Sequence, residues 1–156
     1  MTFTYMEYPS DEELQPGDAA LLEKARTATK DAYAPYSHFR VGAAALLNNG
    51  RIVTGTNQEN ASFPAGICAE RTLLSVASNL YPGIAIDSMA ISYANETGAS
   101  DRPIFPCGIC RQSLQEFSQR TNQPIRLIVS GLIGIVYIFP EADCLLPLAF
   151  TPDELH

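Results

Sequence analysis

The fold is decided by residues 41–56, which read VGAAALLNNGRIVTGT. The run of small and aliphatic residues from Val41 to Leu47 is typical of a buried strand. The tripeptide Asn48-Asn49-Gly50 that follows is a hairpin turn signal, and Arg51 to Thr56 supplies the returning strand. This stretch therefore predicts a buried antiparallel strand pair.

Helical patterns lie on both sides of the hairpin. Before it, Asp18 is expected to cap a helix that Pro35 ends. The apolar stripe of this helix consists of Leu21, Ala25, Ala28 and Ala32. After the hairpin, a second helix is expected to begin near Cys68, and a third follows Pro106. The inward face of the second helix is predicted to hold Leu73, Val76 or Ala77, and Leu80.

Three further apolar runs predict strands, over residues 86–93, 125–129 and 133–138. The order helix, hairpin, helix, strand, helix, strand, strand indicates an α/β fold. We expect a three-layer α/β/α sandwich around a mixed five-stranded sheet. No repeat or linker divides the chain, so one domain is expected over residues 1–156, with residues 1–16 as a flexible tail.

The composition favours a small, neutral or weakly charged ligand. Hydrophobic residues make up 46% of the chain and the formal net charge is −7, so a nucleic acid, which is bound through Lys and Arg, is not expected as a partner. The N-terminus is acidic and lacks a secretory pattern. The longest apolar run, residues 132–139, is far short of the ~20 residues that cross a bilayer. We therefore expect a cytoplasmic protein that does not contact a membrane.

Two cysteine motifs predict a metal site. The first is Cys68-Ala69-Glu70 and the second is Pro106-Cys107-Gly108-Ile109-Cys110. A Cys-x-x-Cys pair alone also fits a redox pair, a structural zinc knuckle or a chance occurrence, and in a reducing compartment metal ligands or free thiols are favoured over disulfides. Three thiolates that leave a fourth position open suit a catalytic zinc, and Glu70 is well placed to carry the proton of a bound water. Both motifs begin predicted helices, where the helix dipole favours thiolates.

Neighbouring residues refine this prediction. Arg71 and Arg111 each follow a motif and are expected to donate hydrogen bonds to the sulfurs, although both also fit solvated surface positions. Cys144 stands alone and is expected in the core rather than as a fourth ligand. The chain has only two histidines, His38 and His156, which leaves little room for a Ser-His-Asp or Cys-His nucleophile.

At these residues the chain resembles cytidine deaminases of the short, homotetrameric class, from about residue 19 to residue 150. The resemblance rests on five motifs: residues 35–44 (PYSHFRVGAA), 57–60 (NQEN), 68–71 (CAER), 106–112 (PCGICRQ) and 145–150 (LLPLAF). It implies one Zn²⁺ per subunit on Cys68, Cys107 and Cys110. It also implies hydrolysis of cytidine and deoxycytidine to uridine and deoxyuridine, with Glu70 moving the protons.

The resemblance assigns further roles to residues that a reading without the family would treat as ordinary. It places Asn57 and Glu59 at the ribose hydroxyls, the Ala69 N–H at the base carbonyl and Phe39 against the pyrimidine ring. Phe150 is expected to reach a neighbouring subunit's site in a homotetramer. Three positions depart from the usual pattern, namely Phe63, Phe105 and Leu148, where Tyr, a small residue and Gly are common.

Two other functions fit the motifs less well. One is a deaminase for another aminopyrimidine such as blasticidin S. The 57–60 motif and Phe39 argue against this alternative. The other is a zinc-stabilised binding module without catalysis, which would contain zinc and release no ammonia from any aminopyrimidine.

Overall fold

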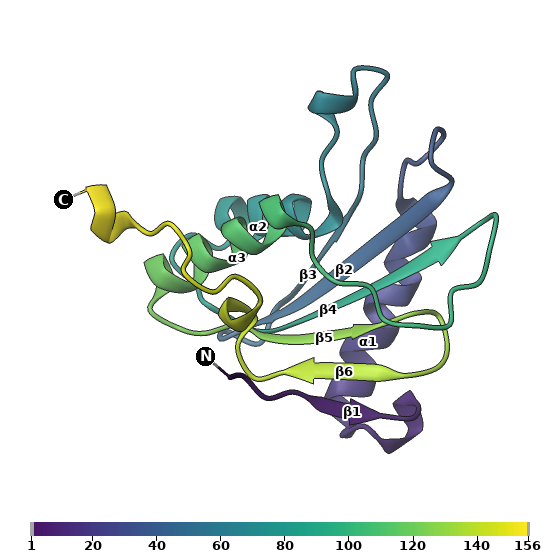
Figure 1. The fold of residues 1–156 in the computed structure, drawn as a ribbon, viewed down its shortest axis with the longest axis horizontal. Helices are drawn as coiled ribbons and strands as arrows, with labels where there is room; N and C mark the ends of the chain where they lie inside the picture. Colours follow the sequence, from purple (N-terminus) through teal and green to yellow (C-terminus); the bar gives the residue numbers. More distant parts are fainter. Residues whose placement is uncertain (1, 156) are drawn as a thin grey trace.

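Within residues 2–155, the part that the computed structural model describes, six strands form one mixed sheet (Figure 1). Their order across the sheet is β1-β6-β5-β4-β2-β3. The strands are β1 (Met6–Tyr8), β2 (Phe39–Leu47), β3 (Ile52–Thr56), β4 (Ile86–Asn95), β5 (Arg126–Ser130) and β6 (Val136–Phe139). Only β4 and β5 pair in parallel among these neighbours.

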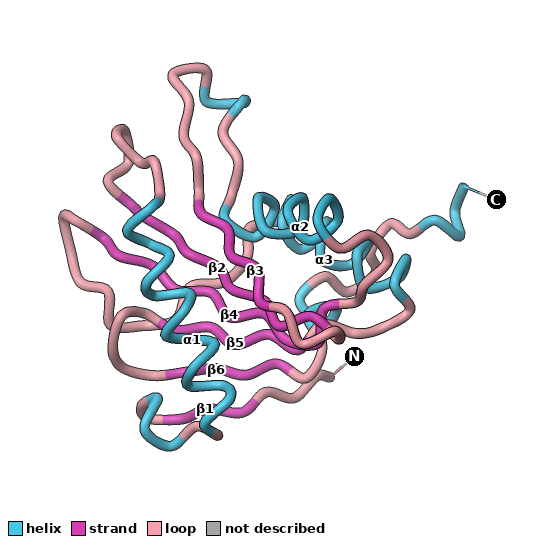
Figure 2. Tube along the Cα trace, turned by 180° about the vertical axis from the view of Figure 1, so that it is seen from behind, coloured by secondary structure: helices cyan, strands magenta, loops and turns pink. Residues whose placement is uncertain are grey.

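The helices form the two outer layers. They are α1 (Pro16–Ala28), α2 (Ala69–Leu80) and α3 (Gly108–Thr121). Helix α1 covers one face of the sheet, and α2 and α3 lie together over the other face (Figures 1 and 2). The predicted α/β/α sandwich is therefore confirmed. No described helix combines the length and the apolar character that crossing a membrane requires.

Alternating side chains of the central strands build two cores. On β2, Ala43 and Ala45 face the core beneath α2 and α3, whereas Ala44 faces the core beneath α1. Successive side chains of a strand point to opposite faces, so a sheet that is covered on both faces needs continuous apolar runs. This explains why residues 41–47 are apolar without alternation.

The prediction of five strands is wrong, because the described sheet has six. The additional strand β1 lies inside residues 1–16, the expected flexible tail, and pairs antiparallel with β6 at the sheet edge. Met1 and His156, which end the domain expected over residues 1–156, lie outside the described residues. Strand β6 begins at Val136 rather than at Ile133, because Gly134 adopts a left-handed φ of 88° that interrupts the extended chain.

Two helix details also differ from the prediction. Helix α1 starts at Pro16, whose ring presets φ for the first helical position. Asp18 therefore lies in the first turn, where its carboxylate accepts two hydrogen bonds of 2.6 Å from Arg126. Leu80, expected to face inward, is 61% exposed because it is the last residue of α2.

Helix α2 lies directly on the backbone of β3. A Cβ atom added at Gly55 would lie 2.5 Å from the Ala69 carbonyl oxygen and 2.5 Å from the Leu73 nitrogen. No side chain fits in that space, and glycine permits such a close approach. The first turn of α2, which carries Ala69 and Glu70, is thereby seated against the sheet.

Candidate functional site

Three cysteine sulfurs converge where α2 and α3 begin. Cys68 occupies the N-cap of α2, Cys107 occupies the N-cap of α3, and Cys110 lies in the first turn of α3. Their Sγ atoms all lie within 4.8 Å of one another, with 3.7 Å between Cys68 and Cys107 and 3.4 Å between Cys107 and Cys110. Tetrahedral zinc with Zn–S bonds near 2.3 Å needs sulfurs about 3.8 Å apart. The three residues therefore fit one zinc ion.

The electrostatics of the cluster favour a thiolate. Hydrogen bonding with Cys110, then with Cys107, and the charge of Arg71 lower the pKa of Cys68 to about 6. The hydrogen bonding with Cys68, together with burial, raises the pKa of Cys110. One sulfur is thus readily ionised, and a cation is needed to draw the proton from its neighbour. Cys144 packs against the core beneath α2 and α3, away from this cluster.

Glu70 is a buried carboxyl beside the sulfurs. Its side chain belongs to the first turn of α2 and the residue is only 5% exposed. Burial raises the pKa of Glu70, and the nearby Cys68 charge raises it further. A buried carboxyl that holds a proton more readily than usual is suited to giving and taking protons.

A cavity of about 670 Å³ opens in front of the cluster. Its wall comes from three segments of the chain, at the start of β2, in the loop before α2 and before α3. The residues predicted to bind substrate or metal that line it are Phe39, Asn57, Glu59, Cys68, Ala69, Glu70 and Cys107. The structure therefore brings together, around one cavity, residues that are as much as 68 positions apart in the sequence.

Asn57 is held by the first residues of β2, and Glu59 is held by the loop before β2. The Asn57 Oδ1 accepts from the Val41 N–H at 2.7 Å, and its Nδ2 donates to the Phe39 carbonyl at 2.9 Å. Glu59 accepts from the Ser37 hydroxyl and from the N–H groups of Tyr36 and Ser37. These hydrogen bonds, chiefly that from the Ser37 hydroxyl, lower the pKa of Glu59. The cavity thus presents a fixed, ionised carboxylate.

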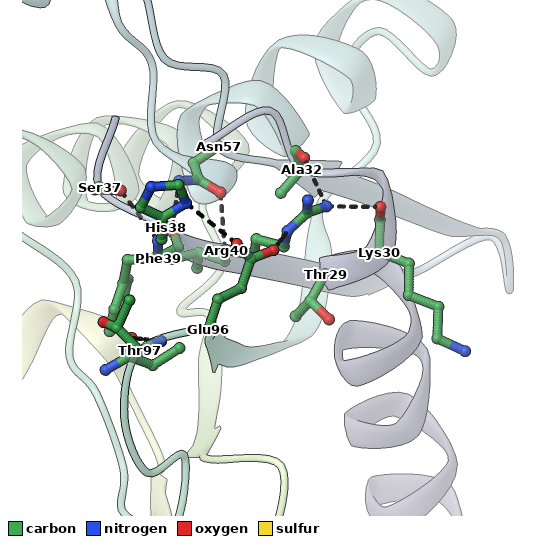
Figure 3. A network of polar contacts seen from close by, with 12 residues as sticks. Thr29, Lys30, Ala32, Ser37, His38, Phe39, Arg40, Asn57, Glu96 and Thr97 are labelled. Carbon is green, nitrogen blue, oxygen red and sulfur yellow. Dashed lines mark hydrogen bonds and ion pairs between the residues drawn. The ribbon is translucent and has the colours of Figure 1, made fainter. Parts of the chain in front are cut away.

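Phe39 and the residues around it form a rigid wall. Its ring stacks on Tyr93 at 4.8 Å between centroids and 17° between planes. Next to it, the Glu96 carboxylate binds both His38 and Arg40, and Arg40 also donates to the carbonyl oxygens of Lys30 and Ala32 (Figure 3). This polar network ties the loop before β2 to the ends of β4 and α1.

The two arginines expected to donate to sulfur are arranged differently from one another. The Nε and Nη1 groups of Arg111 donate to the carbonyl oxygens of Pro106 and Leu145, at 2.8 and 3.0 Å. These two groups therefore fix the backbone rather than a sulfur. Arg71 acts on Cys68 through its charge. Both residues lie where the metal-bearing helices start.

Phe150 is not brought to this cavity by its own chain. It is 58% exposed, its carbonyl oxygen accepts from Gln112 Nε2, and the described lining residues do not include it. The sequence did not predict that Ser37 holds Glu59 in place. It also did not predict that Ile104 and Phe105 line the cavity. Ser37 lies within a recognised motif, whereas Phe105 was visible only as a departure from one.

A family model described as the cytidine and deoxycytidylate deaminase zinc-binding region matches residues 16–123. Among similar proteins, a cytidine deaminase of Halalkalibacterium halodurans is 37% identical over 136 residues, covering 87% of this chain and 96% of the relative. A cytidine deaminase of Sporosarcina psychrophila is 35% identical over 135 residues, covering 86% and 92% of the two chains.

Solved structures agree with these matches. The crystal structure of a cytidine deaminase from Burkholderia pseudomallei has a TM-score of 0.74 and 37% identity, covering 88% of this chain and all of the other. The cytidine deaminase of Mycobacterium tuberculosis has a TM-score of 0.64 and 29% identity, over 84% and 94% of the two chains.

Proposed function

Because the chain belongs to the family of the cytidine and deoxycytidylate deaminase zinc-binding region, we propose that it hydrolyses cytidine and deoxycytidine to uridine and deoxyuridine with release of ammonia. The observation that carries this proposal is the contact of one cavity with both the three-sulfur cluster and the buried Glu70. A metal site and a proton carrier share the wall that a small aromatic ligand would face.

The chemistry divides between the metal and Glu70. A zinc ion held by Cys68, Cys107 and Cys110 would supply a polarised, more acidic water in the cavity. Glu70 accepts a proton from the attacking water and delivers it to N3 of the cytosine ring. It then transfers the proton of the new C4 hydroxyl to the departing amine, so that the C–N bond breaks, ammonia leaves and the C4 carbonyl forms. Its raised pKa supports this role, because the carboxyl must hold the proton between two transfers.

The remaining wall is suited to a nucleoside. We assign Asn57 and Glu59 to the ribose hydroxyls, since an amide and a carboxylate accept hydrogen bonds from them and both side chains are fixed in place. Phe39 offers an aromatic wall for the base. Ala69 is the first residue of α2, so its N–H has no partner within the helix and is available to the base carbonyl.

We further assign a homotetramer in which Phe150 of one subunit completes the cavity of another. Its exposure at the end of the chain, outside its own cavity, supports this arrangement. A cytoplasmic location fits a site that requires reduced cysteines. The test mixes two inactive variants: co-expressed Glu70→Gln and Phe150→Ala subunits should regain activity in mixed oligomers, because some cavities then hold both wild-type residues. A monomeric mass with full activity would contradict the assignment.

The proposed function is tested by measuring product and metal on the same sample. Cytidine, deoxycytidine, cytosine and cytidine monophosphate are assayed by ammonia release and ultraviolet absorbance, and zinc is quantified by mass spectrometry. We expect about one zinc per subunit and turnover of both nucleosides. Zinc without ammonia release from any of the four compounds would instead identify a zinc-stabilised binding module.

A further inference from the structure

Phe105 is an aromatic residue in the cavity wall at its metal end. It lines the cavity with Ile104 and Cys107, and it is two residues from Cys107, whose sulfur belongs to the metal cluster. Two residues of extended chain span at most about 7 Å. Phe105 therefore lies at the metal end of the cavity, where the base is proposed to react, whereas Asn57 and Glu59, proposed for the ribose, come from another segment.

Phe105 is supported from behind by aromatic side chains of β6. Its ring centroid lies 6.0 Å from that of Tyr137 and 6.1 Å from that of Phe139. Tyr5 in turn covers both of these rings, at 4.9 and 5.5 Å, and Phe3 contacts Phe139 at 6.4 Å. Aromatic pairs at such distances attract one another beyond simple burial. A continuous aromatic cluster thus runs from the N-terminal segment to the cavity wall.

The outer part of this cluster lies outside the region that the family model matches. That region is residues 16–123, so both β1 and β6 fall beyond it. Pairing of Glu7 with Tyr137 and of Met6 with Ile138 fixes the register between the two strands. Since neighbouring residues of an extended chain face opposite ways, Tyr5 and Glu7 share one face and Met6 and Tyr8 share the other. Tyr8 accordingly packs against the core beneath α1.

We propose that Phe105 is a specificity-determining residue that limits substituents on the pyrimidine base, and that Tyr5 positions it through Tyr137 and Phe139. This inference rests on the proposed deaminase function. The N-terminal segment then has a role at the cavity, because Tyr5, the residue before β1, closes the outer side of the cluster. Loss of Tyr5 leaves the Phe105 ring without its second layer of support, so the wall yields to a larger base.

The first test changes Phe105 itself. Wild type, Phe105→Ser and the milder Phe105→Leu are assayed on cytidine, on 5-methylcytidine and on N4-methylcytidine, which release ammonia, ammonia and methylamine. One added methyl group in an apolar pocket changes selectivity by about tenfold or more. We expect kcat/KM for at least one methylated substrate, relative to cytidine, to rise by about tenfold. The ratio between cytidine and deoxycytidine, which differ only in the sugar, should stay constant.

The second test changes Tyr5, which touches no substrate. Tyr5→Ala should shift the same base selectivity in the same direction and to a smaller extent, whereas Tyr5→Phe, which keeps the ring, should match wild type. Met6→Ala is the matched control, because Met6 lies next to Tyr5 on the opposite face of the extended chain. A merely structural role of Tyr5 would lower kcat for all substrates equally and leave the selectivity unchanged.

The outcomes separate this inference from the proposed function. If wild type releases no product from cytidine, the deaminase function itself fails. If wild type deaminates cytidine and neither Phe105 variant changes either methylated ratio by more than about twofold, well below the usual effect of one methyl group, the assignment of Phe105 is overturned. If the Phe105 variants shift selectivity and Tyr5→Ala does not, the positioning role of Tyr5 is overturned.

Discussion

The guanidinium of Arg40 is bound by the carboxylate of Glu96, across the ends of β2 and β4 (Figure 3). Its Nη1 group also donates to the carbonyl oxygens of Lys30 and Ala32, both at 3.2 Å. Arg40, which follows Phe39 of the cavity wall, is thus neutralised by a partner. The described residues that line the cavity include neither Lys nor Arg, whereas Glu59 and Glu70 both face it.

This arrangement predicts selectivity for nucleosides over 5′-monophosphates. A phosphate group would bring about two negative charges at pH 7 toward the Glu59 carboxylate. We expect kcat/KM for cytidine to exceed that for cytidine monophosphate by at least about tenfold. Glu96→Gln should reduce this ratio severalfold by freeing Arg40, and the exposed Glu12→Gln should not change it. Equal values for the two substrates in wild type would show that the cavity tolerates phosphate.

Replacing Glu70 by glutamine tests the proton carrier. Glutamine keeps the size of the side chain but cannot accept and return a proton. We expect kcat to fall by about 10⁴-fold or more, because one acid–base step contributes about 10²–10⁴-fold and Glu70 serves more than one transfer. The zinc content and the KM should change far less than kcat, because the three sulfurs and the residues assigned to the ribose, Asn57 and Glu59, remain. Retention of more than about a tenth of wild-type kcat, less than one such step, would remove Glu70 from the mechanism.

Two cysteine variants distinguish a metal ligand from a core thiol. Cys107→Ala removes a sulfur that links the start of α3 to that of α2, so zinc content should fall toward zero and the melting temperature should drop. Cys144→Ala is the control, because this half-buried thiol packs against the core and is not part of the three-sulfur cluster. It should retain about one zinc per subunit. Equal zinc content in the two variants would contradict the proposed ligand set.

Asp11 is expected to stabilise the fold in a pH-dependent way. It binds Arg26, which is only 8% exposed and also donates to the Gly131 carbonyl. The Arg26 hydrogen bond lowers the pKa of Asp11 below its ordinary value of 3.8. A lowered folded-state pKa gives stability that is present above the ordinary value and is lost as pH falls through the folded value.

Urea unfolding of Asp11→Asn measures this contribution. At pH 7 the free energy of unfolding should fall by about 1–2 kcal/mol, because a buried arginine loses a charged partner that solvent partly screens. The difference from wild type should shrink below pH 4. Glu23→Gln is the control, since Glu23 lies 3.9 Å from the same guanidinium and is 68% exposed. An unchanged difference between pH 7 and pH 3 would show that the ion pair contributes nothing.

The main helices and strands could be predicted because each has a local signal. Apolar runs marked the central strands, and Pro106 marked the start of α3. Strand β1 gave no such signal, since Met6–Tyr8 is short and mixed in polarity, and it becomes a strand only by pairing with β6. The end of α1 at Ala28 was missed for a similar reason: Ala32 is buried as expected, but on a loop beyond a 3-10 turn.

In the candidate site, too, some features could be predicted from the sequence and others could not. The cysteines and Glu70 were identified because zinc chemistry restricts the residue types and their spacing. The hydrogen bonds of Arg111 could not be predicted, because the Leu145 carbonyl that it binds lies 34 residues away and is brought near by the fold. The aromatic support of Phe105 likewise depends on contacts between segments that share no motif.

The geometry of the metal centre depends on the absence of a Cβ atom at Gly55. Even the smallest side chain there would push against the first turn of α2 and displace Cys68 and Glu70 together. A survey of tolerated substitutions should therefore rank Gly55 with the cysteines, although it meets neither metal nor nucleoside. The close approach of β3 and α2 therefore restricts the residue at position 55 as closely as zinc binding restricts the cysteines.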